Sequence, residues 1–240
     1  MTAYLFEFIG TAMLILIGNG IVANLVLKET KGADLGWVGI SMGWGMAVFI
    51  GVFISADGSG AHINPAVTFG LSIAGKFSWD LVPGYIICQI LGAMMGNLLV
   101  WLTYKKQYES TQDTDAILAT FSTSPAIRSP FWNMVTEIIG TFALVFGVFF
   151  IAGGSVGEET ISLGSIDALP VALLVIGIGF GLGGPTGYAI NPARDFGPRL
   201  LHAILPIKNK GKSDWRYAWV PIVGPFIGAV IAAMAFMALH

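Results

Sequence analysis

Six long apolar stretches alternate with shorter polar connections along the chain. They run from Tyr4 to Leu27, Leu35 to Ala56, Leu81 to Tyr104, Phe131 to Gly157, Ala168 to Ala193 and Tyr217 to Leu239. A membrane's hydrocarbon core is roughly 30 Å thick and takes about 20 helical residues to cross, and each stretch reaches that length. Only the first and fourth stretches contain a charge. The pattern therefore predicts six membrane-spanning helices.

Composition supports this class and excludes others. Of the 240 residues, 55% are hydrophobic and 11% are charged, which is too little charge to cover a soluble surface. The formal net charge of -2 predicts no nucleic-acid partner, and the single cysteine, Cys88, excludes an intrachain disulfide. No metal-ligand spacing, phosphate-binding glycine loop or nucleophile constellation is present, so we expect no metal, no cofactor and no enzymatic activity. The first stretch lacks a basic leader and contains Glu7, which favours a permanent span over a signal peptide.

The chain contains an internal repeat. The sequence EFIGT at residues 7–11 recurs as EIIGT at 137–141, and INPA at 63–66 recurs at 190–193. The matching positions 7 and 137, 64 and 191, and 92 and 224 lie 130, 127 and 132 residues apart. Each half has three spans, and an odd number of spans inverts the second half relative to the first. We predict one channel domain over residues 1–240, with repeats at about 1–104 and 131–240 joined by a polar surface linker at about 105–130.

Each half also contains a broken segment that is too short to cross. These segments run from Gly58 to Gly75 and from Gly183 through Pro206, and each contains an Asn-Pro pair. Asn is a good N-cap and Pro fits the first helical position, so each pair starts a helix of about ten residues, half the membrane thickness. Entering from opposite faces, the two half-helices meet near the midplane with Asn64 and Asn191 face to face. Paired broken segments in inverted repeats predict the transport site.

The asparagine amides fit a pore. A capping Asn uses its side-chain oxygen on its own helix, which leaves the amide NH2 as a donor to a passing hydroxyl or water. Two helix N-termini, each worth about half a positive charge, would repel cations and protons.

The two motifs, Asn64-Pro65-Ala66 and Asn191-Pro192-Ala193, resemble those of the aquaporin superfamily, and the resemblance covers essentially the whole chain. It implies an all-α integral membrane fold with six transmembrane helices plus two re-entrant half-helices in two inverted repeats. It also implies a homotetramer in the lipid bilayer of the plasma membrane, with both termini cytoplasmic. By the same resemblance, the backbone carbonyls before each motif accept hydrogen bonds in the pore. They belong to Gly60, Ala61, His62, Ile63, Gly187, Tyr188 and Ala189.

The resemblance also assigns a selectivity filter to Trp44, Gly179, Tyr188 and Arg194. Arg194 is a charge at membrane depth, which is costly and marks a functional position, although pairing with Asp195 is the alternative. Trp44 and Gly179 resemble the glycerol-conducting branch, in which the small residue leaves room and the aromatic wall takes the carbon edge of a polyol. Asp195 after the second motif is similar to the same branch. These residues imply a passive channel for glycerol and other small uncharged solutes, with some water permeability, that excludes ions and protons.

Tyr188 departs from the phenylalanine common in that branch. Its hydroxyl has three alternatives: to bond solute, to bond Arg194 or to narrow the filter. Two other channel functions therefore stay open, one specialised for water and one for another neutral solute such as urea, dihydroxyacetone or undissociated lactic acid. A coupled secondary transporter is a further alternative, but it needs a carboxylate or ion site at the midplane.

Glu7 and Glu137 occupy matching positions near the start of each half. Intramembrane carboxylates suggest ion coupling, but we interpret both as structural acceptors for the re-entrant loops. Glycines on the spans are expected to let helices cross closely. These are Gly43, Gly45, Gly92, Gly96, Gly177, Gly181, Gly224 and Gly228.

The basic residues conflict with the implied orientation. Apart from Arg194, all but Lys76 lie on the side opposite the termini. By the positive-inside rule the termini would then be outside. We adopt the orientation implied by the resemblance.

Overall fold

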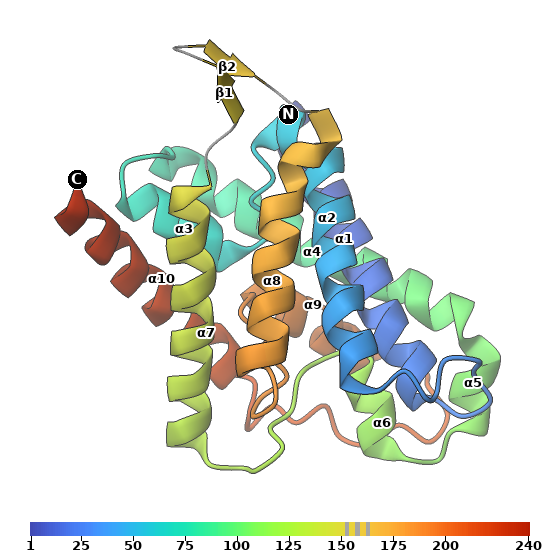
Figure 1. Cartoon of the computed structure of the whole chain (residues 1–240). Coiled ribbons are helices and arrows are strands. Elements are labelled where there is room, and N and C mark those ends of the chain that lie inside the picture. The colour runs from blue at the N-terminus through green and yellow to red at the C-terminus, as the bar shows by residue number, and fades with distance from the viewer. Residues whose placement is uncertain (152–153, 157–158, 162–163) are drawn as a thin grey trace.

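The computed structural model describes residues 1–151, 154–156, 159–161 and 164–240. Within these residues, six helices, taken with the short turns that precede two of them, are long and apolar enough to cross a membrane (Figure 1). They are α1 (Thr2–Val26), α2 (Gly36–Ser59), α4 (Val82–Thr103) after η1 (Trp79–Leu81), α7 (Pro130–Phe150), α8 (Leu169–Leu182) after η2 (Gly164–Ala168), and α10 (Val220–Leu239). The predicted membrane fold with six spanning helices is confirmed.

Two spans end earlier than predicted. The fourth ends at Phe150, before a glycine pair that disfavours a helix; the rest of its predicted range includes residues outside the described ones. A short antiparallel pair, β1 (Gly154–Val156) and β2 (Glu159–Ile161), follows it and was not predicted. The fifth ends at Leu182 rather than Ala193, because two glycines and a proline at 183–185 interrupt the apolar run.

The two predicted half-helices are α3 (Pro65–Ile73) and α9 (Pro192–Ile204). Their 9 and 13 residues are too short for a membrane roughly 30 Å thick. Within each repeat the first helix packs on the last, α1 on α4 and α7 on α10. Between repeats, α3 packs against α10 and α9 against α4. Each half-helix is therefore held by the last helix of the other repeat, which interlocks the two halves.

Glycines allow the first and last helices of each repeat to cross closely, as predicted. An added Cβ would lie within 3 Å of an atom of the first helix of the same repeat at Gly92, Gly96, Gly224 and Gly228. Gly43 and Gly45 are equally crowded, against Ile21 and Ile176. The expectation fails at Gly177 and Gly181, where a Cβ would meet no atom of the described chain within 4 Å. These two glycines face outward from α8.

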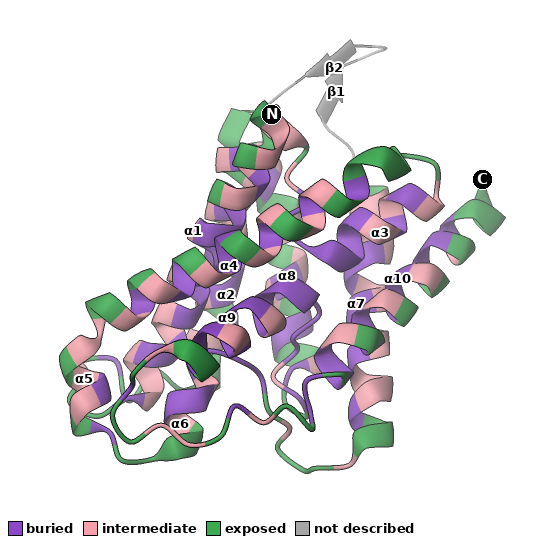
Figure 2. Cartoon of the chain, turned by 180° about the vertical axis from the view of Figure 1, so that it is seen from behind, coloured by how far each residue is buried: buried purple, intermediate pink, exposed green. Residues whose placement is uncertain are grey.

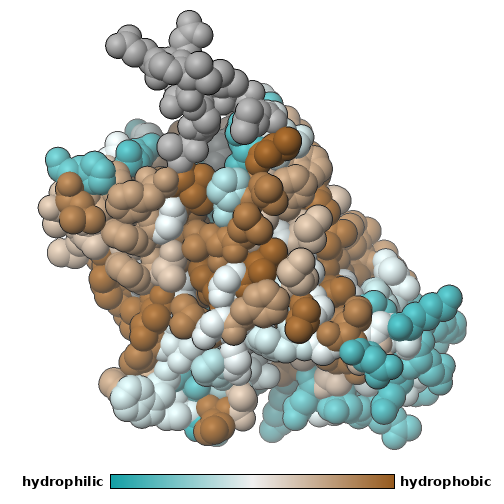
Figure 3. All heavy atoms as spheres, viewed as in Figure 1, coloured by the Kyte–Doolittle hydropathy of each residue, from teal (hydrophilic) through white to brown (hydrophobic). Residues whose placement is uncertain are grey.

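Both termini lie at one end of the bundle, here called the termini end (Figure 1). The opposite end, the linker end, carries α5 (Lys105–Ser110) and α6 (Thr114–Ala119). In Figure 3 the middle of the molecule is covered by hydrophobic side chains, while hydrophilic ones gather beside α5 and α6. Exposed residues form stripes along α10, whereas α9 is mostly buried (Figure 2). This exposed apolar belt fits contact with lipid chains rather than water.

The linker is more buried than its polar sequence predicts. Tyr108, Ile117 and Phe121 are at most 1% exposed and pack in one apolar cluster with Val100 of α4 and Leu201 of α9. Asp113 caps α6 by accepting hydrogen bonds from two backbone N–H groups. The linker therefore forms part of the core at the linker end and holds α9 in place.

Candidate functional site

Each half-helix begins at an asparagine, as the sequence predicts. Asn64 caps α3 and accepts a hydrogen bond from the backbone N–H of Ala66 at 2.9 Å. Asn191 caps α9 and accepts from the N–H groups of Ala193 at 3.0 Å and Arg194 at 3.2 Å. A proline follows each cap in the first turn, where its missing N–H removes no hydrogen bond.

The two caps are joined across the interface between the repeats. The Asn64 amide nitrogen donates to the Ile190 carbonyl at 2.8 Å, and the Asn191 amide nitrogen donates to the Ile63 carbonyl at 2.9 Å. The half-helices therefore meet with their N-termini together. Because an amide has two N–H donors, this pairing uses one and leaves one. Each asparagine side chain therefore has one N–H group left to donate to a solute, whereas the sequence alone suggested two.

The backbone before each asparagine is strained in the same way in both halves. Positive φ values occur at Gly60, Ala61 and Ile63, and again at Gly187, Tyr188 and Ile190. Counted back from each asparagine, these positions match one to one. A β-branched residue with positive φ is a genuine outlier, and such strain persists only where the surroundings over-determine it. The two halves therefore repeat the same succession of positive φ angles before each asparagine.

Two buried carboxylates hold these strained segments, as the sequence predicts. Glu7 accepts from the backbone N–H groups of His62 at 2.9 Å and Ile63 at 2.7 Å. Glu137 accepts from those of Ala189 at 3.0 Å and Ile190 at 2.9 Å. In each half, one carboxylate binds two successive N–H groups that no helix or strand could satisfy.

A cavity of about 160 Å³ lies where the two strained segments meet. The strained segments, the two capping asparagines and Arg194 bring polar groups to its lining: Gly60, Ala61, His62, Ile63, Asn64, Tyr188, Ala189, Ile190, Asn191 and Arg194. The helices α1, α2, α3, α7 and α8 bring apolar side chains: Leu14, Trp44, Val48, Val52, Val67, Leu71, Leu144, Val148, Val171 and Val175. Of the residues proposed for the carbonyl ladder, Gly187 is absent from this lining. The lining therefore combines hydrogen-bonding groups with hydrocarbon.

Arg194 and Trp44 form one corner of the cavity. The guanidinium carbon of Arg194 lies 4.4 Å from the centroid of the Trp44 ring, within the range of a cation–π contact. Behind the indole stands Gly18 of α1, where an added Cβ would collide with the ring. The Arg194 side chain is buried, and its Nη1 has no hydrogen-bond partner among the described residues. Arg194 is thus not paired with Asp195.

Gly179 does not line the cavity, which differs from the expectation that its missing side chain opens the filter directly. Its carbonyl accepts a hydrogen bond from Trp37 Nε1 at 2.9 Å. A Cβ added at Gly179 would lie 3.0 Å from both the Ser41 and the Tyr188 hydroxyl oxygens. The vacant side-chain position is therefore filled by these neighbours. Gly179 acts by letting Tyr188 lie close against α8.

Asp195 does not line the cavity and belongs to a buried ion pair. Its carboxylate binds Arg199 Nε at 2.7 Å and Nη2 at 3.0 Å, and both side chains are fully buried. It also accepts from the backbone N–H of Thr123 at 2.8 Å and from its hydroxyl at 2.7 Å. These hydrogen bonds from protein groups offset the cost of burying the charged carboxylate.

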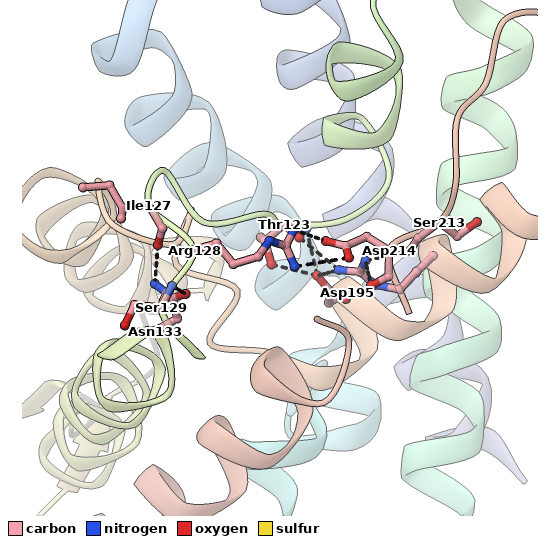
Figure 4. A network of polar contacts seen from close by, with 9 residues as sticks. Thr123, Ile127, Arg128, Ser129, Asn133, Asp195, Ser213 and Asp214 are labelled. Carbon is pink, nitrogen blue, oxygen red and sulfur yellow. Dashed lines mark hydrogen bonds and ion pairs between the residues drawn. The ribbon is translucent and has the colours of Figure 1, made fainter. Parts of the chain in front are cut away.

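Arg199 extends this network to three segments of the chain. It donates to the carbonyls of Thr123 at 2.9 Å, Ser213 at 2.8 Å and Asp214 at 3.2 Å. Figure 4 shows Thr123, Asp195 and Asp214 converging on this point. At the surface the Asp214 carboxylate pairs with Arg128, which raises the pKa of Arg128 above its ordinary value. The linker, α9 and the loop before α10 are thereby fastened together next to Arg194.

Comparison with known proteins identifies the family. Residues 1–236 match the model of the major intrinsic protein family. The chain belongs to the major intrinsic protein family. It is 53% identical to a probable glycerol uptake facilitator protein of Thermotoga maritima, with 98% of each chain covered. It is 51% identical to the glycerol uptake facilitator protein of Streptococcus pneumoniae, with 96% of each chain covered.

A solved structure of the same family supports the fold. The X-ray structure of the aquaglyceroporin from Plasmodium falciparum matches with a TM-score of 0.84 at 33% identity, covering 98% of this chain and 94% of that one. The predicted resemblance to the aquaporin superfamily and its glycerol branch is thus confirmed, and this major intrinsic protein is a multi-pass membrane protein.

Several contacts of this site do not follow from the sequence pattern. Thr123 and Arg199 complete the Asp195 network, and Trp37 and Ser41 support Tyr188 and Gly179. The spacing of Asp195 and Arg199 was a usable signal, because side chains four residues apart share a helix face. The other three contacts join segments far apart in sequence and left no local pattern.

Proposed function

We propose that this chain is a passive transmembrane channel for glycerol and other small uncharged solutes, with some water permeability. The observation that carries the proposal is the cavity at the joined N-termini of the half-helices, whose lining combines hydrogen-bonding groups with hydrocarbon. Two relatives of the chain are named as glycerol uptake facilitators, which supports the same solute. A polyol has hydroxyl groups and a carbon chain, and the lining of the cavity supplies contacts for both.

The proposed pathway gives each part of the solute a partner. Trp44 and the valines of the cavity lining contact the carbon edge. The guanidinium of Arg194 and the remaining amide N–H groups of Asn64 and Asn191 donate to hydroxyl oxygens, and the backbone carbonyls accept from hydroxyl hydrogens. Binding through several weak contacts, rather than one strong site, lets a solute enter and leave in either direction.

The same groups would exclude ions and protons. Two helix N-termini and Arg194 bring positive charge to one region, which opposes cations and protons. A coupled transporter is less well supported, because no carboxylate of the described residues lines the cavity. The carboxylates of Glu7 and Glu137 are occupied by backbone N–H groups instead. We accordingly propose no ion coupling and no catalytic activity.

The assembly and orientation follow the family resemblance. We propose one channel domain over residues 1–240, a homotetramer in the plasma membrane and cytoplasmic termini. The basic residues at the linker end weigh less against this orientation than their number suggests. Arg199 is fully buried in its ion pair, Arg128 is paired with Asp214, and the Lys210 ammonium donates to three carbonyls at the end of α9.

The test is the flux of glycerol into proteoliposomes, followed by stopped-flow light scattering. Val175 of α8 lines the cavity and is 4% exposed, whereas Leu173 on the same helix is 56% exposed toward the lipid. We expect rapid re-swelling under glycerol with the wild type and with Leu173→Trp. With Val175→Trp, re-swelling should fall to the rate of vesicles without protein. Rapid water efflux without glycerol entry in the wild type would instead favour a water channel.

A further inference from the structure

The Tyr188 ring lies against α8, and two glycines make this possible. A Cβ at Gly183 would collide with the ring, and one at Gly179 would lie 3.0 Å from the hydroxyl oxygen. The edge of the ring meets Trp37, with centroids 5.9 Å apart and planes at 74°. Tyr188 thus contributes its ring to the cavity while its hydroxyl points into the space between α8 and α2.

The Ser41 hydroxyl of α2 reaches the same point. Its oxygen also lies 3.0 Å from the Cβ position of Gly179. Ser41 is fully buried and Tyr188 is 6% exposed, and the Ser41 side chain is the hydrogen-bonding neighbour of the Tyr188 hydroxyl. Neither oxygen makes a hydrogen bond to any other group of the described residues. A buried hydroxyl without a partner is unfavourable, and each of these can both donate and accept. Each hydroxyl is therefore the available partner of the other.

The buried position of the Tyr188 hydroxyl decides between the roles expected for it, which are to bond solute, to bond Arg194 or to narrow the filter. The atom is closed off from the cavity, so it neither faces a solute nor narrows the passage. Arg194, on the other hand, is stacked on Trp44. The width available to a solute at this corner is therefore set by how firmly the Tyr188 ring is kept against α8.

We propose that Ser41 and Tyr188 hold each other by a hydroxyl–hydroxyl hydrogen bond, and that Ser41 is thereby a positioning residue for the aromatic wall of the filter. This inference rests on the proposed function as a glycerol channel. With the bond made, the ring stays over the glycines and the passage admits a three-carbon polyol. Without it, the ring is free to turn into the cavity, and glycerol is slowed more than water.

The experiment measures glycerol and water permeability in the same proteoliposomes and compares their ratio. Once the permeability of vesicles without protein is subtracted from both values, the ratio is independent of how much channel is inserted, so a loss of folded protein does not imitate the effect. Ser41→Ala and Tyr188→Phe should each lower the glycerol-to-water ratio by about two- to tenfold, the factor that the net free energy of one hydrogen bond corresponds to. The double variant should lower it no further, and Ser41→Thr, which keeps the hydroxyl, should retain the wild-type ratio.

Ser55→Ala is the matched control. Ser55 is a fully buried serine on the same helix, but its hydroxyl donates to the Gly51 carbonyl at 2.6 Å and does not reach Tyr188. Its ratio should equal that of the wild type. Unchanged ratios in both single variants, or effects of the two that add, would overturn the inference. Tyr188→Phe removes a single oxygen and keeps the test valid if Ser41→Ala fails to assemble.

Failure of the inference is distinguishable from failure of the proposed function. If the wild type passes glycerol and removal of either hydroxyl leaves the glycerol-to-water ratio unchanged, only the role of Ser41 is wrong. If the wild type passes no glycerol, the proposed function is wrong and the inference falls with it.

Discussion

The two re-entrant halves share their backbone but differ in charge. Both have an asparagine cap, the same run of positive φ values and one carboxylate beneath the strained segment. Three residues after each asparagine, however, the first half has Val67 where the second has Arg194. Both residues line the cavity. The duplicated parts build the meeting point of the helices, and the charged side chain at this position of the cavity lining belongs to the second half alone.

The same contrast recurs on the buried side of each half-helix. Thr68 in α3 occupies the position of Asp195 in α9, and Ser72 that of Arg199. The Thr68 hydroxyl lies 3.1 Å from His62 Nδ1 and accepts from Gln89 Nε2 at 3.0 Å, so the first half is fastened by neutral groups. The second half is fastened by a buried ion pair. An ion pair is stable only while both partners are present, which makes the second half the more sensitive to substitution.

Breaking the ion pair should produce the largest loss of stability. Arg199→Met leaves the Asp195 carboxylate buried without its charge partner, and we expect a loss of about 3–5 kcal/mol in the free energy of unfolding. Ser72→Ala, the equivalent change in the first half, should lose about 1 kcal/mol or less. Unfolding of the purified channels in detergent measures both. Equal losses at the two positions would mean that the halves are fastened alike.

Substitution of the buried carboxylates Glu7 and Glu137 should give the next largest loss of stability. Glu7 accepts four hydrogen bonds, because Ser59 and Gln89 donate to it at 2.7 Å in addition to two backbone N–H groups. In Glu7→Gln, one acceptor oxygen becomes a donor that faces these donors. We expect a loss of about 1–3 kcal/mol, larger than for Glu137→Gln. The same unfolding measurement checks this, and a greater loss at Glu137 would contradict it.

Substitution of the capping asparagines should give the smallest difference in stability between the two halves. Asn191 accepts from two backbone N–H groups and Asn64 from one. Replacing either by alanine should lose about 0.5–2 kcal/mol, with Asn191→Ala the worse of the two. Asn191→Ser keeps a capping oxygen and should recover most of the loss. A stability order opposite to this would show that the bonds to Ile63 and Ile190, rather than the caps, dominate.

Local patterns predicted most of the fold and the centre of the site. Apolar length gave the six spans, and the Asn-Pro pairs gave both caps and the start of both half-helices. The repeat predicted the matching roles of Glu7 and Glu137 as acceptors for the re-entrant loops. These features depend on backbone chemistry within a few residues or on symmetry between the halves.

Contacts between segments far apart in the chain could not be predicted from local sequence patterns. The sequence leaves open a pairing of Asp195 with Arg194, but neighbours on a helix point to different faces, and Arg199 one turn later is the partner. The room expected at Gly179 is occupied by Tyr188 and Ser41, which only tertiary packing brings there. The sequence also does not show that each asparagine amide donates one hydrogen bond to a carbonyl of the other half.

A passive pore carries neutral solutes without ions, and this property can be measured directly. The direct test loads proteoliposomes with a pH-sensitive dye and imposes a glycerol gradient while re-swelling is followed in the same sample. We predict rapid re-swelling with no change of internal pH, and no decay of an imposed pH gradient beyond that of vesicles without protein. A pH change that accompanies glycerol entry would contradict a passive pore and require coupled transport.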